Sequence, residues 1–138
     1  MASSQEYIEK LRKSGLRPTK QRIKICEVLF NTDKTFHFTI NDLVKKIGLE
    51  DNQKISLATV YNTVHAFEKK GYLKEIAINS SQTYFDTNTT DHHHFFDENQ
   101  KELIDLEDDD VQPIKIKKTI PGKKIKSVEV LVRVNSDI

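Results

Sequence analysis

The stretch "TTDHHHFFDENQKELIDL" (residues 89–106) places three histidines side by side in a chain that has five histidines among 138 residues. Neutral imidazole and carboxylate groups are donors that Zn²⁺, Mn²⁺ and Fe²⁺ accept in mixed nitrogen and oxygen sites. If the run forms a β-strand, its side chains alternate, so His92 and His94 share one face and His93 lies on the other. The run therefore predicts a divalent metal site. The alternative is a solvated segment without a ligand.

Composition limits the kind of site and the kind of protein. Cys26 is the only cysteine, which excludes an internal disulfide and a cysteine-rich zinc site. Hydrophobic residues make up 36% of the chain and charged residues 31%, as in ordinary folded proteins. No apolar run approaches the roughly 20 residues of a membrane span, and "MASSQEYIEKLRKSG" has no signal-peptide core. We expect a cytoplasmic protein of one domain or two small ones.

The net charge of +1 hides an asymmetry between the two halves of the chain. Residues 1–71 carry 13 Lys and Arg against 8 Asp and Glu, whereas residues 72–138 carry 9 against 13. A basic first half suggests a polyanionic partner, and an acidic second half with clustered histidines suggests bound cations. The two halves are thus expected to have different functions.

Helix signals dominate the first half. Residues that favour N-cap positions precede four stretches with apolar residues at helical spacing; they are Ser3, Thr19, Thr39 and Ser56. Glu6 and Asp42 stand three residues after the first and third caps, as capping-box partners do. Gly48 and Gly71 are expected to end the third and fourth helices. The buried stripe of the fourth helix is predicted at Leu57, Val60, Val64 and Phe67.

A hairpin is predicted directly after the fourth helix. The segments "YLKEIAI" and "TYFDTN" alternate with a period of two and flank the turn signal "NSSQ". Several short helices followed by a hairpin are the order of a winged helix-turn-helix, in which the helix before the wing enters the major groove.

The face of the fourth helix opposite its apolar stripe carries small, hydroxyl, amide and aromatic groups, which suit base edges and thymine methyl groups. The candidate DNA-binding residues here are Ser56, Thr59, Tyr61 and Asn62. Upstream basic residues, chiefly Arg17 and Arg22, would contact phosphates. The alternative is an ordinary solvated face.

Three segments of the chain resemble the ferric uptake regulator (Fur) superfamily: "GLRPTKQRIKICEVLF", "ISLATVYNTVHAFEKKGYL" and "HHHFFDENQKELIDL". Within it, "SLATVYNT", "TYFDTN" and "HHHFF…ELIDL" are most similar to the iron response regulator (Irr) branch. The resemblance covers nearly the whole chain. It implies an α+β protein with a winged-helix DNA-binding domain at residues 1–85 and a small α/β dimerisation domain at residues 86–138. It also implies a homodimer, or a higher oligomer, that represses or activates iron and heme genes.

The same resemblance selects metal ligands. Fur proteins usually follow the histidine segment with paired zinc-binding cysteines, and "DENQ" (residues 97–100) stands there instead. A second family site maps to Asp91, His93, Gln112 and Val128, where two ligands are missing, so we expect it to bind metal poorly. The surviving site maps to His37, Asp86, His92, His94 and Asp105. Because His37 belongs to the DNA-binding domain, a cation bound there would fix the orientation of the domains and act as a switch.

Heme is the second ligand that the Irr resemblance implies, at His92, His93 and His94. Phe95 and Phe96 would give a porphyrin apolar contact, although a plain core role predicts the same residues. Cys26 is followed by Glu27 rather than proline, so thiolate-mediated heme capture is not expected. A regulator that senses only Fe, Mn or Zn, without heme, is the alternative.

Two rival classes of function remain, a metal-dependent enzyme and a metal or heme buffer that binds no DNA. No glycine-rich phosphate loop, nucleophile elbow or HExxH helix is present, so we expect no enzyme. An observation of metal-dependent DNA binding would reject the hypothesis that the protein is only a metal or heme buffer.

The end of the chain is expected to add a helix and a strand. In Fur-like folds a helix follows Asp105, and Pro113 would be tolerated in its first turn. The final strand is predicted in "IKSVEVLVRV", with Val128, Val130, Val132 and Val134 on one face.

Overall fold

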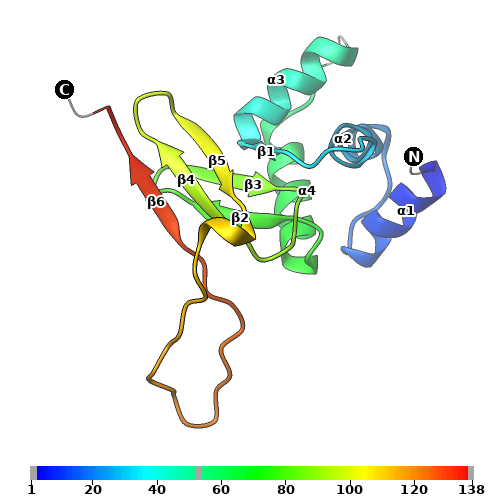
Figure 1. Ribbon diagram of the computed structural model, residues 1–138. Coiled ribbons are helices and arrows are strands. Elements are labelled where there is room, and N and C mark those ends of the chain that lie inside the picture. The colour runs from blue at the N-terminus through cyan, green and yellow to red at the C-terminus, as the bar shows by residue number, and fades with distance from the viewer. Residues whose placement is uncertain (1–2, 52–53, 137–138) are drawn as a thin grey trace. The chain divides into compact units, whose positions relative to one another are not determined.

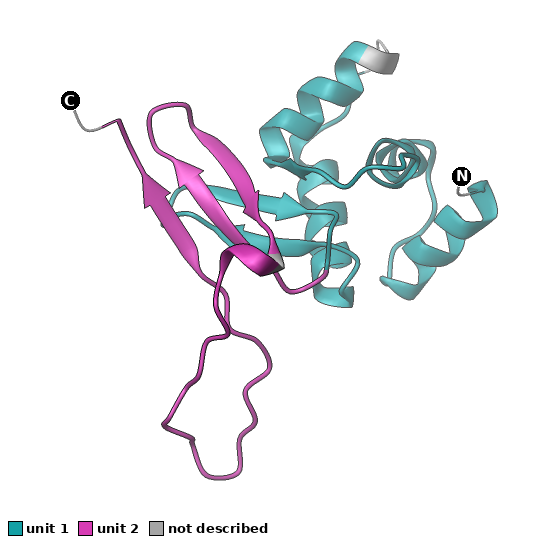
Figure 2. Ribbon diagram, in the orientation of Figure 1, with its two compact units in different colours: residues 1–89 teal, residues 90–138 magenta. Residues whose placement is uncertain are grey.

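The computed structural model describes residues 3–51 and 54–136 and forms two compact units, residues 1–89 and residues 90–138 (Figure 2). The first unit contains α1 (Ser4–Lys13), α2 (Lys20–Phe30), β1 (His37–Phe38), α3 (Ile40–Asp51), α4 (Leu57–Lys70), β2 (Lys74–Ala77) and β3 (Thr83–Asp86) (Figure 1). The second contains β4 (His93–Asp97), β5 (Glu102–Leu106), a 3₁₀ turn (Asp108–Asp110) and β6 (Leu131–Val134). The fold class is α+β, as predicted.

The four helices of the first unit begin at the predicted caps. Thr19 Oγ1 accepts a hydrogen bond from Arg22 N at 3.2 Å, and Ser56 Oγ accepts one from Thr59 N at 3.1 Å. Ser3 and Thr39 cap α1 and α3 in the same way. Each cap satisfies an amide that would otherwise lack a partner, which stabilises the helix by about 1 kcal/mol.

Two predictions about helix residues are wrong. Helix α3 continues past Gly48 to Asp51, since Gly48 keeps a helical backbone and the buried Ile47 beside it holds this turn against the core. Leu57 is 55% exposed, because the first turn of α4 extends beyond the core. Its place in the buried stripe belongs to Thr63, whose hydroxyl donates to the Thr59 carbonyl at 2.8 Å and is thereby satisfied.

The core of the first unit lies between the helices and their sheet. Buried side chains of all four helices form one apolar cluster, in which the Phe67 ring packs edge-on against the Phe30 ring at 5.6 Å between centroids. Gly71 ends α4 in the left-handed conformation with φ 88°, as predicted. The antiparallel sheet follows in the order β1-β3-β2, and the hairpin of β2 and β3 is the predicted wing. This is a winged helix-turn-helix in which α4 directly precedes the wing.

The second unit is a three-stranded sheet in the order β5-β4-β6 (Figure 1). Strands β4 and β5 form an antiparallel hairpin, and β6 pairs with β4 in parallel. Phe96, Leu103 and Leu106 are its buried apolar side chains. In this structure Phe96 is therefore a core residue, which is the alternative to porphyrin contact that the sequence left open.

The segment between the 3₁₀ turn and β6 differs from the prediction. Residues 112–127, called here the lysine-rich loop, are exposed and contain no α-helix, and the last strand begins only at Leu131. The "IKIKK" pattern alternates with a period of two, which provides no apolar stripe for a helix. Lys123 N donates to the Ile120 carbonyl at 3.0 Å, and Gly122 has φ 76°, so Pro121 and Gly122 form a tight turn at the tip.

Candidate metal ligands and nucleic-acid interface

The exposed face of α4 carries the predicted base-reading residues. Tyr61 is 51% exposed and Asn62 is exposed beside it. Ser56 and Thr59 stand at the start of the helix, where their hydroxyl oxygens are 2.7 Å apart and Ser56 Oγ also caps the helix. The two hydroxyls thus hydrogen-bond to each other. Tyr61 and Asn62 are therefore the more available groups for contact with bases.

The Tyr61 ring makes an aromatic contact that the sequence did not predict. Its ring centroid lies 4.1 Å from that of His65, one helical turn later. His65 in turn packs edge-on against Phe85 of β3, at 5.5 Å and 87°. Since Phe85 is only 1% exposed, the buried sheet fixes His65, and His65 limits the orientations of Tyr61.

Of the two arginines predicted to contact phosphates, Arg17 precedes α2 and Arg22 lies in its first turn. Arg22 Nη1 donates to the Arg17 carbonyl at 2.8 Å, so part of the Arg22 guanidinium holds the preceding turn. Arg17 is the more exposed of the two. Arg22 therefore has a structural role that Arg17 does not share.

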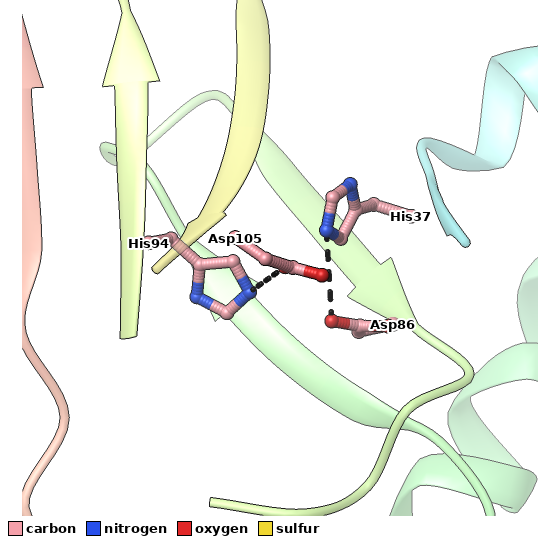
Figure 3. A group of neighbouring side chains, drawn as sticks. All are labelled: His37, Asp86, His94 and Asp105. Carbon is pink, nitrogen blue, oxygen red and sulfur yellow. Dashed lines mark ion pairs between the residues drawn. The ribbon is translucent and has the colours of Figure 1, made fainter. Parts of the chain in front are cut away.

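The first unit contributes one pair of candidate metal ligands. His37 and Asp86 stand opposite each other where β1 pairs with β3, and His37 Nε2 lies 3.8 Å from Asp86 Oδ2 (Figure 3). The other carboxylate oxygen, Oδ1, accepts a hydrogen bond from Asn88 N at 2.8 Å. Asp86 is only 1% exposed, and a buried carboxylate of this kind requires a proton, a hydrogen-bond donor or a cation beside it.

The second unit contributes a denser set. His94 and Asp105 are cross-strand neighbours on β4 and β5, with His94 Nε2 3.2 Å from Asp105 Oδ1 (Figure 3). His92 Nε2 lies 3.4 Å from the same oxygen, and the two imidazole centroids are 4.4 Å apart. His92 and His94 therefore meet one carboxylate, as their shared strand face predicts.

The tautomer of His92 follows from its second ring nitrogen. Nδ1 lies 2.7 Å from the Thr90 carbonyl oxygen, which can only accept, so Nδ1 carries the proton. In the neutral ring, Nε2 then points a lone pair at Asp105. Two acceptors at this distance need a proton or a metal ion between them, and a carbonyl that fixes the ring in this way is typical behind metal-ligating histidines. The donors of this unit therefore fit a divalent cation.

His93, one of the candidate heme ligands, lies on the opposite face of β4, and its ring is already hydrogen-bonded. Its Nδ1 accepts a hydrogen bond from Val130 N at 2.9 Å. The proton of the neutral ring is consequently on Nε2, which has no lone pair to offer to a heme iron. Axial ligation by His93 would require the loss of this bond or a change of tautomer.

The positions that carry cysteines in many Fur proteins form a tight turn here. Asp97 Oδ1 accepts hydrogen bonds from Asn99 N at 3.0 Å and Gln100 N at 3.1 Å, and Lys101 follows with φ 55°. The Asp97 side chain thus stabilises the turn that connects β4 to β5. Gln112, one of the residues mapped to the second family site, is exposed in the lysine-rich loop.

Cys26 belongs to the core. Its side chain is fully buried, and burial raises the pKa of its thiol to about 12. The thiolate form needed to bind metal or heme iron is therefore scarce at neutral pH, as expected for a residue on the buried stripe of α2.

The chain therefore combines a winged helix with a small sheet whose histidine and aspartate side chains fit a divalent cation. The Ferric uptake regulator family matches residues 13–133, and the chain belongs to this family. Proteins of this family regulate transcription and are not enzymes. In the described part of the chain, no helix has the length and apolar character needed to cross a membrane.

Sequence relatives agree with this family, and solved structures have the same fold. The chain is 36% identical over 102 residues to the peroxide operon regulator of Bacillus subtilis, covering 73% of this chain and 68% of that protein. It is 32% identical to the peroxide-responsive repressor PerR of Staphylococcus aureus, with 75% and 68% covered. The manganese-containing ferric uptake regulator of Pseudomonas aeruginosa has the same fold, at a TM-score of 0.67, 22% identity, and 96% and 98% coverage. The narrower placement in the Irr branch is not confirmed by these relatives.

Proposed function

We propose that this protein is a DNA-binding transcription regulator whose affinity for its operator is set by a divalent cation bound at His37, Asp86, His92, His94 and Asp105. The observation that carries the proposal is the pair of His92 and His94 Nε2 atoms directed at Asp105 Oδ1, at 3.4 and 3.2 Å. Duplex DNA would be contacted by α4 through Ser56, Thr59, Tyr61 and Asn62, and by Arg17 and Arg22.

The connection between the two ligand sets supports a shared cation. Asp86 and His92 are separated by residues 87–91, so their Cα atoms can be at most about 22 Å apart. A cation that takes His37 and Asp86 from one unit and His94 from the other would restrict their relative motion. When bound, the cation supplies a positive charge that ligands of both units share. The winged helices of a dimer would then keep the spacing that successive major grooves require.

The donor set indicates which cations are suitable. Two carboxylates neutralise a divalent charge, and three imidazoles complete five donors. Imidazole and carboxylate donors suit Zn²⁺, Mn²⁺ and Fe²⁺, and the number of donors that the cation takes would decide among them, because structural zinc sites are almost always four-coordinate. Heme has weaker support, because His93 is bonded to Val130 N and the Irr placement is not confirmed. We therefore propose the metal-responsive regulator without heme.

The first prediction tests this function by duplex anisotropy with operator DNA selected from random sequence. The metal-free protein should bind weakly, and Mn²⁺ or Fe²⁺ should strengthen binding, because the cation selects the DNA-competent arrangement. Replacing His92 and His94 together with alanine should abolish tight metal binding, as measured by elemental analysis, and should remove the metal effect on DNA. Gln112→Ala is the matched control and should change neither.

Two outcomes would reject this proposal. Unchanged metal stoichiometry in the double variant would overturn the ligand assignment. DNA binding that is equal with and without metal would overturn the switch. If heme instead releases the DNA with a shift of its Soret band, the heme-sensing alternative is the correct one.

A second candidate function is a response to peroxide, which is favoured by the names of the Bacillus and Staphylococcus relatives. Fe²⁺ can reduce peroxide, whereas Mn²⁺ does so far less readily. In the same assay, hydrogen peroxide should then release DNA from the iron-loaded protein and not from the manganese-loaded protein. Equal behaviour of the two metal forms would reject this candidate and leave the metal response intact.

A further inference from the structure

A lysine-lined hollow of about 620 Å³ lies in the first unit, next to the face of α4 that carries Tyr61. Its walls come from the end of α1 and from the exposed face of α4. The lining residues are Lys13, Ser14, Tyr61, Asn62, His65, Ala66, Lys69 and Lys70. The set contains three lysines and no carboxylate, so the hollow is strongly positive.

The three ammonium groups have no counter-charge within the described part of the chain. Lys13, Lys69 and Lys70 are exposed, and none of them forms an ion pair with a described residue. Other lysines of this unit are engaged: Lys24 pairs with Glu27, and Lys10 lies over the rings of Phe30 and Tyr72. Three like charges around one hollow repel each other, and an anion there would relieve the repulsion.

The position of the hollow along α4 indicates which anion it would meet. Tyr61 and Asn62 are in the first half of the helix, whereas Lys69 and Lys70 are in its last turn. Eight residues of α-helix span about 12 Å. In helix-turn-helix proteins, the first residues of the recognition helix contact base edges, so its end emerges beside the phosphate backbone.

A structural role explains only part of this arrangement. Lysines in the last turn of a helix interact favourably with its negative end. That effect applies to Lys69 and Lys70 at the end of α4 and to Lys13 at the end of α1, but it does not require the two helix ends to line one hollow. The shared hollow and its Tyr61 and Asn62 wall remain unexplained by helix stability.

We propose that this hollow binds backbone phosphates of the DNA strand beside the groove that α4 reads, with Lys13, Lys69 and Lys70 as the phosphate-binding groups. The proposal rests on the proposed DNA-binding function and adds a site that contributes affinity without sequence discrimination. Each lysine that contacts a phosphate displaces a counterion, so binding should weaken with salt.

The second prediction measures that salt dependence with the full-length, metal-loaded protein. The variant Lys13→Gln/Lys69→Gln/Lys70→Gln should lower the slope of log K against log [salt] by about three per bound subunit, since each lost contact removes about 0.9. The ratio of cognate to scrambled affinity should stay unchanged. Lys34→Gln/Lys45→Gln removes exposed lysines outside the hollow and should leave the slope as it is.

A charge-preserving variant separates phosphate contact from folding. Lys13→Arg/Lys69→Arg/Lys70→Arg should keep the salt slope, and thermal unfolding should show all variants folded. If the wild type binds duplex DNA and the glutamine variant keeps the full slope, the hollow is not a phosphate site and the regulator proposal stands. If the wild type binds no duplex DNA at all, both proposals fail.

Discussion

The orientation of Tyr61, the proposed base-reading residue, depends on a residue that does not itself need to touch DNA. The Tyr61 ring contacts the His65 ring at a tilt of 46°, and His65 packs edge-on against the buried Phe85. An exposed tyrosine on a helix can otherwise adopt several rotamers, and ordering it on binding costs side-chain entropy. If α4 reads bases as proposed, His65 is therefore a positioning residue for Tyr61.

The third prediction separates base reading, positioning and phosphate contact at single residues. Tyr61→Ala should reduce discrimination between cognate and scrambled duplexes by roughly 1–3 kcal/mol, since it removes contacts to base edges. His65→Ala should lose part of that discrimination, and His65→Phe should restore it because the phenyl ring keeps the ring contact with Tyr61. Arg17→Ala should weaken both duplexes equally.

Anisotropy titrations on the two duplexes at fixed salt concentration measure all four variants. Identical profiles for Tyr61→Ala and Arg17→Ala would contradict the division between base and phosphate contacts. A His65→Phe variant that behaves like His65→Ala would show that the imidazole itself, rather than its ring contact, is required.

At the scale of elements, the lysine-rich loop is the part of the fold least protected by structure. Its residues 112–127 are exposed, and its one main-chain hydrogen bond in the structure closes the turn at Pro121 and Gly122. The isoleucines and lysines alternate there without a neighbouring strand to pair with. A segment of this kind opens at little cost in free energy.

The fourth prediction is that trypsin first cleaves the native protein in this loop. It contains six of the lysines, from Lys115 to Lys126, whereas Lys45 and Lys69 are held in helices α3 and α4. Mass spectrometry at low protease ratio should therefore detect cleavage after these loop lysines before cleavage after the helical ones. Cleavage at equal rates, or slower in the loop, would show that the loop packs against a surface in solution.

Comparison of sequence and structure shows which signals are local. The caps at Thr19, Thr39 and Ser56 were predictable, because a hydroxyl accepts from an amide two or three residues later. Gly48 was misassigned as a helix end, since packing of the neighbouring turn decides whether a glycine adopts the left-handed conformation. The helix that the family resemblance implies after Asp105 is absent from the lysine-rich loop, whose alternating pattern offers no apolar stripe.

The candidate metal site shows the same division. The shared face of His92 and His94 follows from strand alternation, and the structure directs both at Asp105. The bond from Val130 N to His93 depends on the parallel pairing of β6 with β4, which connects residues far apart in sequence. The support of His65 by Phe85 likewise depends on how the sheet packs against α4, so no local pattern could reveal it.

At the scale of the whole molecule, charge and ligands are divided between two units. Residues 1–89 carry 14 Lys and Arg against 10 Asp and Glu, whereas residues 90–138 carry 8 against 11. His37 and Asp86 belong to the basic unit, and His92, His94 and Asp105 belong to the acidic one. A cation bound by all five would therefore couple the unit that carries the winged helix to the unit that carries most of the ligands.

The fifth prediction is that this coupling is reciprocal. If the cation raises affinity for operator DNA by some factor, thermodynamic linkage requires that DNA raise affinity for the cation by the same factor, typically about 5–150-fold. Mn²⁺ affinity, measured by competition with a chelating indicator, should therefore rise on addition of cognate duplex and rise less with scrambled duplex. His92→Ala/His94→Ala should lose the coupling while it keeps basal DNA binding, because the winged helix is untouched. Since linkage holds for any mechanism, unequal factors would show that further cations bind during the titration. A Mn²⁺ affinity that does not change on addition of cognate duplex would contradict control of DNA binding by this site.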